Sequence, residues 1–304
     1  MEIVVNKLVE ECFTMNEIIS NVFHKNIHIL DWISKAVIYF REGRYDDAIE
    51  AVAEVSEDIT QVADVIEKNR EYFDLVSVDS IAEMLEGILN AKHSQDFVLL
   101  ADLLELQMES FLCNVQSYIM KKEDLFFFDE SRYLRQIGKL KAKIENNKQF
   151  LLDFSEEINP AQLLEDGYRI ELTSCGLMTV VKRDHMGIAH YLHTNHKISQ
   201  EAFLLARSFI RPEVDTYVVA GLGLGYHVLE LNQLVPKAKI KIMESDMNII
   251  KLCCAFSNIE KLLDNPNITF RYDYEGNELE LDRVRKTENE ALCIHYPSYR
   301  LDCH

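Results

Sequence analysis

Three glycines at alternate positions separate an apolar segment from a helix-like one in the stretch TYVVAGLGLGYHVLEL, residues 216–231. A strand that runs into Gly221, Gly223 and Gly225 and then into a helix places backbone N–H groups and the positive end of the helix dipole at the edge of a sheet. Glycine lets a ligand approach the backbone closely, and the helix N-terminus favours negative charge. The pattern therefore predicts a binding site for a nucleotide or a related cofactor.

A carboxylate at the end of the next strand would complete such a site, because it accepts the ribose hydroxyls of a nucleotide. Glu244 lies 19 residues after Gly225, and Asp246 is close by. The expected cofactor-binding residues are Gly221, Gly223, Gly225, Tyr226, His227, Glu244 and Asp246. We expect the amides from Ala220 to His227 to face an open pocket that the side chain of Glu244 borders.

The glycine spacing leaves three roles open for this turn. Dinucleotide-binding folds have the pattern G-x-G-x-x-G, whereas Tyr226 is bulky where that pattern needs a small residue. The spacing G-x-G-x-G is typical of S-adenosylmethionine-dependent methyltransferases, but Val219 stands where those enzymes usually carry an acid. A mononucleotide or nucleotide-sugar site, an S-adenosylmethionine site and a purely structural turn are all compatible with the sequence.

Two groups of side chains have the right types for a metal site. One is in the run HMGIAHYLHTNH and consists of His185, His190, His193 and His196. The other is at the C-terminus and consists of Cys293, His295, Cys303 and His304. The alternating texture of the first run predicts strand and turn, not the helix that would bring two imidazoles to one ion, and Pro297 separates the two pairs of the second group. We therefore predict no metal site.

The common catalytic motifs are missing from this sequence. It contains no G-x-S-x-G elbow, no H-E-x-x-H and no P-loop lysine. We assign no catalytic residue. If the chain is an enzyme, we expect a transferase, either glycosyltransferase-like or a methyltransferase.

The charge balance argues against two classes of partner. With 32 basic and 51 acidic residues the formal charge is −19, which repels nucleic-acid phosphates and anionic membrane surfaces. No apolar run approaches the roughly 20 residues that span a bilayer, and the N-terminus MEIVVNKLVEECF carries acids where a signal peptide needs a basic start. We expect a cytoplasmic protein that binds neither nucleic acid nor membrane. Its seven cysteines, with no C-x-x-C pair, should be reduced.

Proline and glycine divide the chain into two halves of different character. All five prolines follow residue 159, and only three of the ten glycines precede residue 150, so the first half should consist of long helices. The expected domains are an all-α helical bundle (1–125), a bridging helix (126–160), a small β-rich segment plus a helix (161–212) and an α/β Rossmann-like domain (213–304). We expect the bundle to bind a protein partner or a second copy of the chain. The basic stretch 132–148 should be the solvated face of a helix.

Apolar spacing sets the expected elements of both halves. In the first half one helical stripe is predicted from Phe97, Leu100, Leu104, Met108, Phe111, Val115 and Tyr118. Other helices are expected near 2–40, 45–70 and 79–92, the last with a capping box of Ser80 and Glu83. In the second half we expect strands at 217–220, 239–244, 268–272 and 291–295 and helices at 226–234 and 247–263. This alternation predicts a parallel sheet with right-handed crossovers.

The segments YLHTNHKISQEAFLLARSF and VDTYVVAGLGLGYHVLELNQLVPKAKIKIMESD resemble the N-terminal portion of bacterial motility accessory factors, the glycosyltransferase-like proteins that put nonulosonic acid sugars on flagellin. The matching residues are His193-Thr194, Glu201-Ala202, Gly221 to His227 and Glu244, and the resemblance covers about residues 165–304. In that family the sugar-transfer site lies in a following domain, entered through a phrase of the Gly-Ser-Gly-Pro-Ser type. This chain ends at HYPSYRLDCH before any such phrase. The resemblance therefore implies a noncatalytic protein that supports flagellin glycosylation, with flagellin as an expected partner.

Overall fold

The computed structural model describes residues 2–74, 76, 78–123, 128–144, 148–184, 186–272 and 289–299, without the side chains of 2–16, 78–80, 149 and 299. The chain divides into two compact units, one of residues 1–125 with 174–177 and one of residues 126–173 with 178–304. The protein is mixed α/β, with helices in its N-terminal part and a parallel sheet in its C-terminal part. Among the residues described, no helix has both the length and the apolar character needed to cross a membrane.

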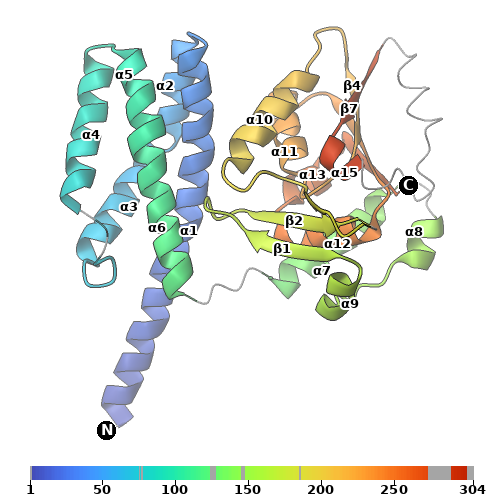
Figure 1. The fold of residues 1–304 in the computed structure, drawn as a ribbon, viewed down its shortest axis with the longest axis horizontal. Coiled ribbons are helices and arrows are strands. Elements are labelled where there is room, and N and C mark those ends of the chain that lie inside the picture. The colour runs from blue at the N-terminus through green and yellow to red at the C-terminus, as the bar shows by residue number, and fades with distance from the viewer. Residues whose placement is uncertain are drawn as a thin grey trace. The chain divides into compact units, whose positions relative to one another are not determined.

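Helices make up the described elements of the N-terminal unit. They are α1 (Glu2–Arg41), α2 (Tyr45–Glu54), α3 (Ser56–Lys68), α4 (Val78–His93), α5 (Phe97–Asp102), the π-helix η1 (Leu103–Met108) and α6 (Glu109–Lys122). Figure 1 shows α1 as the longest of them, and it packs against α2, α3, α5 and α6. Because α4 begins at Val78, Ser80 lies inside the helix and is not the N-cap that we expected.

The apolar stripe predicted from Phe97 to Tyr118 is confirmed at four of its seven positions. Leu100, Leu104, Met108 and Val115 are buried as expected, and Phe97 at the start of the stripe is partly buried. After Met108, Phe111 and Tyr118 are also only partly buried, and Leu112 and Ile119 take their places in the core. A π-helix bonds residue i to i+5, so η1 contains more residues per turn than an α-helix and shifts the stripe after it by about one residue.

The C-terminal unit contains two sheets and their covering helices. Along the chain, three helices precede the first sheet: α7 (Glu130–Lys143), α8 (Lys148–Asp153) and α9 (Pro160–Glu165). One helix, α10 (Ile198–Phe209), lies between the two sheets in the sequence. The antiparallel sheet has the order β1-β2-β3, with β1 (Tyr168–Leu172), β2 (Met178–Arg183) and β3 (Ala189–Tyr191). The second sheet alternates with helices as β4 (Thr216–Ala220), α11 (Tyr226–Leu234), β5 (Lys239–Glu244), α12 (Met247–Phe256), α13 (Glu260–Asp264), β6 (Ile268–Tyr272), β7 (Glu290–Ile294) and α15 (Tyr296–Tyr299).

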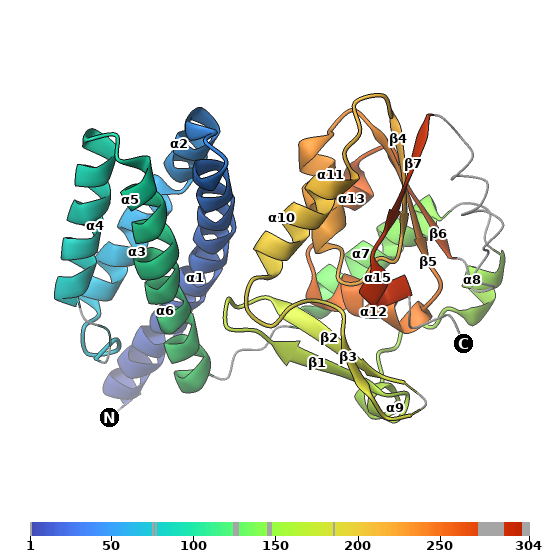
Figure 2. The ribbon, with the colours of Figure 1, turned by 45° about the horizontal axis from the view of Figure 1, so that its top comes forward.

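All pairs in the second sheet are parallel, and the strand order is β6-β5-β4-β7. The expected strands agree with the observed ones to within one residue at each end. β4 is buried along its whole length, which explains its continuous apolar sequence TYVVA. In Figure 2, α10 and α11 lie side by side next to this sheet, and they are in contact.

Two long helices of the prediction are each two helices in the structure. The described part of the predicted bridging helix 126–160 contains α7 and α8, and α7 ends where Ile144 becomes extended and bridges to Phe270. The expected helix 247–263 consists of α12 and α13, because the backbone of Ser257 is extended (φ −118°, ψ 154°).

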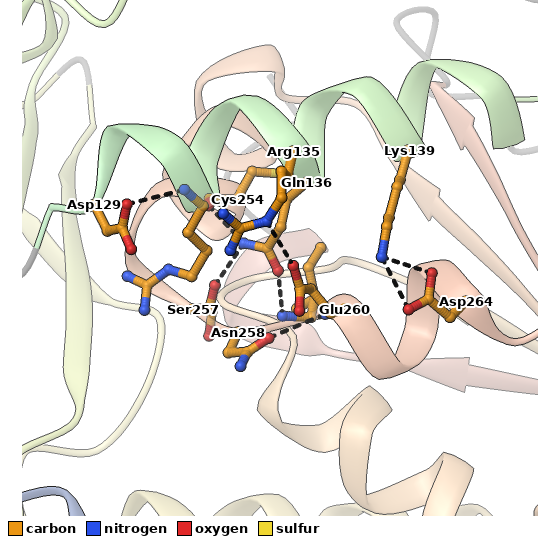
Figure 3. Close-up of polar contacts among 11 residues, drawn as sticks. Asp129, Arg135, Gln136, Lys139, Cys254, Ser257, Asn258, Glu260 and Asp264 are labelled. Carbon is orange, nitrogen blue, oxygen red and sulfur yellow. Dashed lines mark hydrogen bonds and ion pairs between the residues drawn. The ribbon is translucent and has the colours of Figure 1, made fainter.

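One buried side chain of α7 stabilises the break between α12 and α13 (Figure 3). The Gln136 amide nitrogen donates to the carbonyls of Cys254 (2.7 Å) and Ser257 (2.9 Å), and its oxygen accepts from the Ile259 amide (2.7 Å). A helix end leaves backbone groups without intrahelical partners, and buried groups of this kind need a partner. Gln136, which is fully buried, supplies three such partners at once.

We expect the substitution Gln136→Leu to lower the free energy of unfolding by about 3 kcal/mol, because three buried backbone groups lose their hydrogen bonds. Urea unfolding followed by circular dichroism measures this loss. Gln162→Leu, at an exposed position of α9, should change the value by less than about 0.5 kcal/mol. Equal stability of the two variants would contradict this role of Gln136.

Basic side chains of α7 form ion pairs with acids of α13 and hydrogen bonds with backbone carbonyls in and after that helix. Arg135 lies 3.3 Å from Glu260, and Lys139 lies 2.8 Å from Asp264 (Figure 3). Lys143 donates to the carbonyls of Leu262 and Ile268. The Arg135 and Lys139 side chains are exposed as predicted, whereas Arg132 and Lys143 of the same stretch are half-buried. The two exposed ion pairs contribute at most about 1 kcal/mol each.

The core of the C-terminal unit contains three inert thiols. Cys253, Cys254 and Cys293 are fully buried, and burial raises the pKa of Cys254 and of Cys293 to about 12 and raises that of Cys253 as well. Because the thiolate is the reactive form, these thiols should resist alkylation by iodoacetamide at pH 8 in the folded protein and react in urea. Peptide mapping by mass spectrometry reads each thiol separately, and Cys113, which is half-buried, serves as the internal control. Labelling of Cys254 as fast as of Cys113 would contradict the prediction.

Candidate functional site

The glycine turn lies at the carboxyl edge of the parallel sheet, at the place where the strand order changes direction. From β4 the chain passes to β5 and β6 on one side, while β7 pairs with the other side of β4. In open α/β sheets the crevice at such a point is the usual place for a ligand. Gly221 to Gly225 follow β4 there, and His295 follows β7.

Glu244, at the end of β5, lies next to the turn as expected. Its side chain is 4% exposed and accepts hydrogen bonds from three backbone amides: Leu222 (2.7 Å), Ser245 (3.0 Å) and Asp246 (3.1 Å). The carboxylate thus bonds to an amide of the glycine turn itself. In this conformation Glu244 holds the turn against β5.

A second amide of the turn is bonded to His193, which comes from the segment after β3. Leu224 N donates to His193 Nε2 at 2.9 Å. The backbone of His193 is held on β2 by Thr179, whose hydroxyl donates to the His193 carbonyl (3.0 Å) and accepts from its amide (3.2 Å). The small antiparallel sheet therefore positions His193 against the glycine turn.

The first and second glycines are required by the chain's own packing. A Cβ atom on Gly221 would lie 2.9 Å from Ser298 Cβ and 3.0 Å from the His295 carbonyl oxygen. A Cβ atom on Gly223 would lie 2.9 Å from His193 Nε2. The space beside the turn, which we expected to be open, is thus filled by His193, His295 and Ser298.

Three histidine rings form a buried stack beside the turn. His227 and His295 are parallel at 4.4 Å between centroids, and the His193 ring lies 5.2 Å from that of His295. Burial, and to a smaller degree the neighbouring His193, lowers the pKa of His227 to about 3, against the opposing effect of the Gly221 carbonyl. Burial likewise lowers the pKa of His295 well below its usual range. Both rings are therefore neutral at pH 7.

The remaining expected residues divide into two groups. His227 Nε2 lies 3.2 Å from the Gly221 carbonyl, and the left-handed Gly225 (φ +79°) precedes α11 as its N-cap, so both belong to the turn. The Tyr226 hydroxyl donates to the Met178 carbonyl at 3.0 Å, and so the side chain reaches β2. Asp246 is the N-cap of α12 and pairs with Lys182 (2.7 Å) and the Tyr168 hydroxyl, so it joins the small sheet to α12.

The side chains at this edge of the sheet are imidazoles and a carboxylate. The Leu222 and Leu224 amides, which could bind a phosphate, are bonded to Glu244 and His193. Sequence reasoning missed His295 and Ser298 as parts of this site. A signal was present, since residues at the carboxyl ends of neighbouring parallel strands meet at one edge of the sheet, and His295 directly follows β7, the strand next to β4. Assignment of the seven expected residues to a cofactor stays a prediction.

Comparisons with known proteins found one family model and one solved structure that are similar to parts of this chain. A family model described as a domain of unknown function, DUF8042, matches residues 15–117, about a third of the chain and within its helical unit. No curated protein matches the chain. The crystal structure of MNMC2 from Aquifex aeolicus is similar over 60% of this chain and 60% of that chain, with 17% sequence identity and a TM-score of 0.24, a similarity too low to support an argument.

Proposed function

We propose that the protein supports flagellin glycosylation as a noncatalytic protein of the motility-accessory type, and that its C-terminal unit is a Rossmann-like module that binds a nucleotide or a protein partner. The observation that carries this proposal is the motif GLGLGYH, residues 221–227, at the carboxyl end of β4. Its resemblance to motility accessory factors extends to the segment around His193 and Glu201. The strand order β6-β5-β4-β7 is compatible with a Rossmann-like arrangement.

Two contacts favour a noncatalytic role for the turn. The Leu222 and Leu224 amides are bonded to Glu244 and His193. Catalytic sites aim preorganised donors at the position where charge develops on the substrate. These two donors are aimed at the chain's own side chains, which supports a binding or scaffolding role.

Deletion of the gene tests the proposed role in the cell. We expect flagellin from the deletion strain to lack its nonulosonic acid sugars in intact-mass measurements, and we expect a plasmid copy of the gene to restore them. Flagellin of unchanged mass in the deletion strain would refute the proposal.

Isothermal titration against nucleotides, nucleotide sugars and S-adenosylmethionine tests the ligand-binding part. A nucleotide or nucleotide sugar that binds should also raise the melting temperature, since a ligand that binds only the folded state stabilises it. If none of these compounds binds, partner binding remains as the role of the module. A response to S-adenosylmethionine alone would replace the proposal with the methyltransferase alternative.

A further inference from the structure

Three side chains capable of ligating a metal ion converge beside the glycine turn from separate segments of the C-terminal unit. His193 follows β3, Glu201 lies in the first turn of α10, and His295 follows β7. One ligand atom from each lies within 4.8 Å of the ligand atoms of the other two. The fold brings His295 beside His193 and Glu201, which precede it by 102 and 94 residues in the sequence.

An independent observation comes from the buried ring of His295. The residue is 1% exposed, and its Nε2 atom is buried without a hydrogen-bond partner. Its other nitrogen, Nδ1, lies 2.6 Å from the Ser298 hydroxyl. When Nδ1–H donates to that hydroxyl, Nε2 carries a free lone pair. A buried polar atom of this kind is costly unless something binds to it.

The other two side chains are held in place by backbone contacts. Glu201 Oε2 accepts from the Thr194 amide at 2.9 Å, which leaves Oε1 3.6 Å from His193 Nδ1. The His193 side chain is 2% exposed, whereas that of Glu201 is 35% exposed. A contact of this type behind the ligand atom orients a metal-binding carboxylate. The partly exposed Glu201 also gives an ion a route from solvent.

We propose that His193 Nδ1, Glu201 Oε1 and His295 Nε2 bind a divalent cation of the zinc class. Two imidazole nitrogens and one carboxylate oxygen are a donor set that suits zinc, with a fourth position for water. In a tetrahedral zinc site the donors are about 3.4 Å apart, because each lies about 2.1 Å from the metal. The ligand atoms now lie within 4.8 Å of one another, so binding of the ion would draw them together by up to about 1.4 Å.

Binding of the cation requires His193 to change tautomer. Leu224 N–H donates to Nε2 of His193, so without the cation the ring proton is on Nδ1. For Nδ1 to bind the cation as a neutral imidazole, that proton leaves Nδ1 and a proton is taken up at Nε2, and the hydrogen bond from Leu224 N–H is broken. The loss of this bond costs free energy, so we expect weaker binding than in a structural site with four protein ligands.

The bound ion would join three segments across the carboxyl edge of the sheet. It would connect the small sheet, α10 and the end of β7, and it would do so whether or not the module binds a nucleotide. We predicted no metal site from the sequence, where His193 and His295 belong to two separate groups of side chains and Glu201 belongs to neither. Cys303 and His304, from the C-terminal group considered there, lie outside the described residues.

Zinc titration of the full-length, tag-free, chelator-treated protein tests the proposal. In competition with a chromophoric chelator we expect one zinc ion per chain, together with a higher melting temperature. Glu201→Gln should weaken binding at least about tenfold and still fold, because its amide oxygen can accept from Thr194 N–H. His295→Gln should weaken binding more strongly, and circular dichroism without zinc reports whether that variant is folded.

His190→Gln is the matched control, because His190 is exposed on β3 and pairs with Asp184 outside this cluster. It should bind zinc as the wild type does. Cobalt substituted at the site should give a visible spectrum in the wild type and in His190→Gln but not in Glu201→Gln. The proposal is overturned if the wild type binds no zinc, or if Glu201→Gln binds it with wild-type affinity.

Discussion

Replacement of Gly221 by alanine is expected to lower the free energy of unfolding by about 4 kcal/mol. The residue has φ +91°, where a side chain costs roughly 1–2 kcal/mol. The added Cβ would also lie 3.0 Å from the backbone oxygen of His295 and 2.9 Å from Ser298 Cβ. His295 N–H is bonded to the Ala220 carbonyl at 2.9 Å, so this backbone cannot move away without breaking the link between the segment after β7 and the end of β4. Overpacking of this kind adds about 1–3 kcal/mol.

Gly187→Ala separates the two contributions, because Gly187 has φ +79° and nothing within 4 Å of an added Cβ. We expect this variant to lose only the conformational part, roughly 1–2 kcal/mol. Urea unfolding followed by circular dichroism is the appropriate measurement, since Trp32, the single tryptophan, lies in the N-terminal unit. Similar losses in the two variants would mean that the segment after β7 does not press against the glycine turn.

Replacement of Glu244 by alanine is expected to lower the free energy of unfolding by about 5 kcal/mol. Its carboxylate accepts from three backbone amides, and hydrogen bonds to a charged group contribute about 1.5–3 kcal/mol each. Alanine leaves the amides of Leu222, Ser245 and Asp246 without this acceptor. The glycine turn would then lose its link to the end of β5.

Two further variants show whether the loss comes from these bonds. Glu244→Gln keeps one acceptor oxygen but turns an NH₂ group toward the amides, so we expect a loss between that of alanine and the wild type. Glu260→Ala removes the same type of side chain from the ion pair with Arg135, which lies at the surface. This variant should lower the free energy of unfolding by at most about 1 kcal/mol. A Glu244→Ala protein as stable as Glu260→Ala would contradict the role of the Glu244 carboxylate in holding the glycine turn.

The elements of the parallel sheet could be predicted because their signals are local. A strand such as TYVVA, buried on both faces, is a continuous apolar run, and glycine marks the turn that follows it. The shifted stripe after Met108 and the break after Phe256 could not be predicted in this way. The first depends on a π turn, and the second on a glutamine that is 118 residues away from its partner Cys254 in the sequence.

The sequence by itself determined that a glycine turn follows the first strand of a parallel sheet and that an acid ends the second strand, because strand, turn and helix signals lie within about 30 consecutive residues. Only the tertiary structure decided what fills the space beside that turn. His193, His295 and Ser298 reach it through the pairing of β2 with β3 and of β4 with β7, and strand pairing between distant segments leaves no periodic trace in the sequence. For the same physical reason the cluster of His193, Glu201 and His295 becomes visible only in the folded chain.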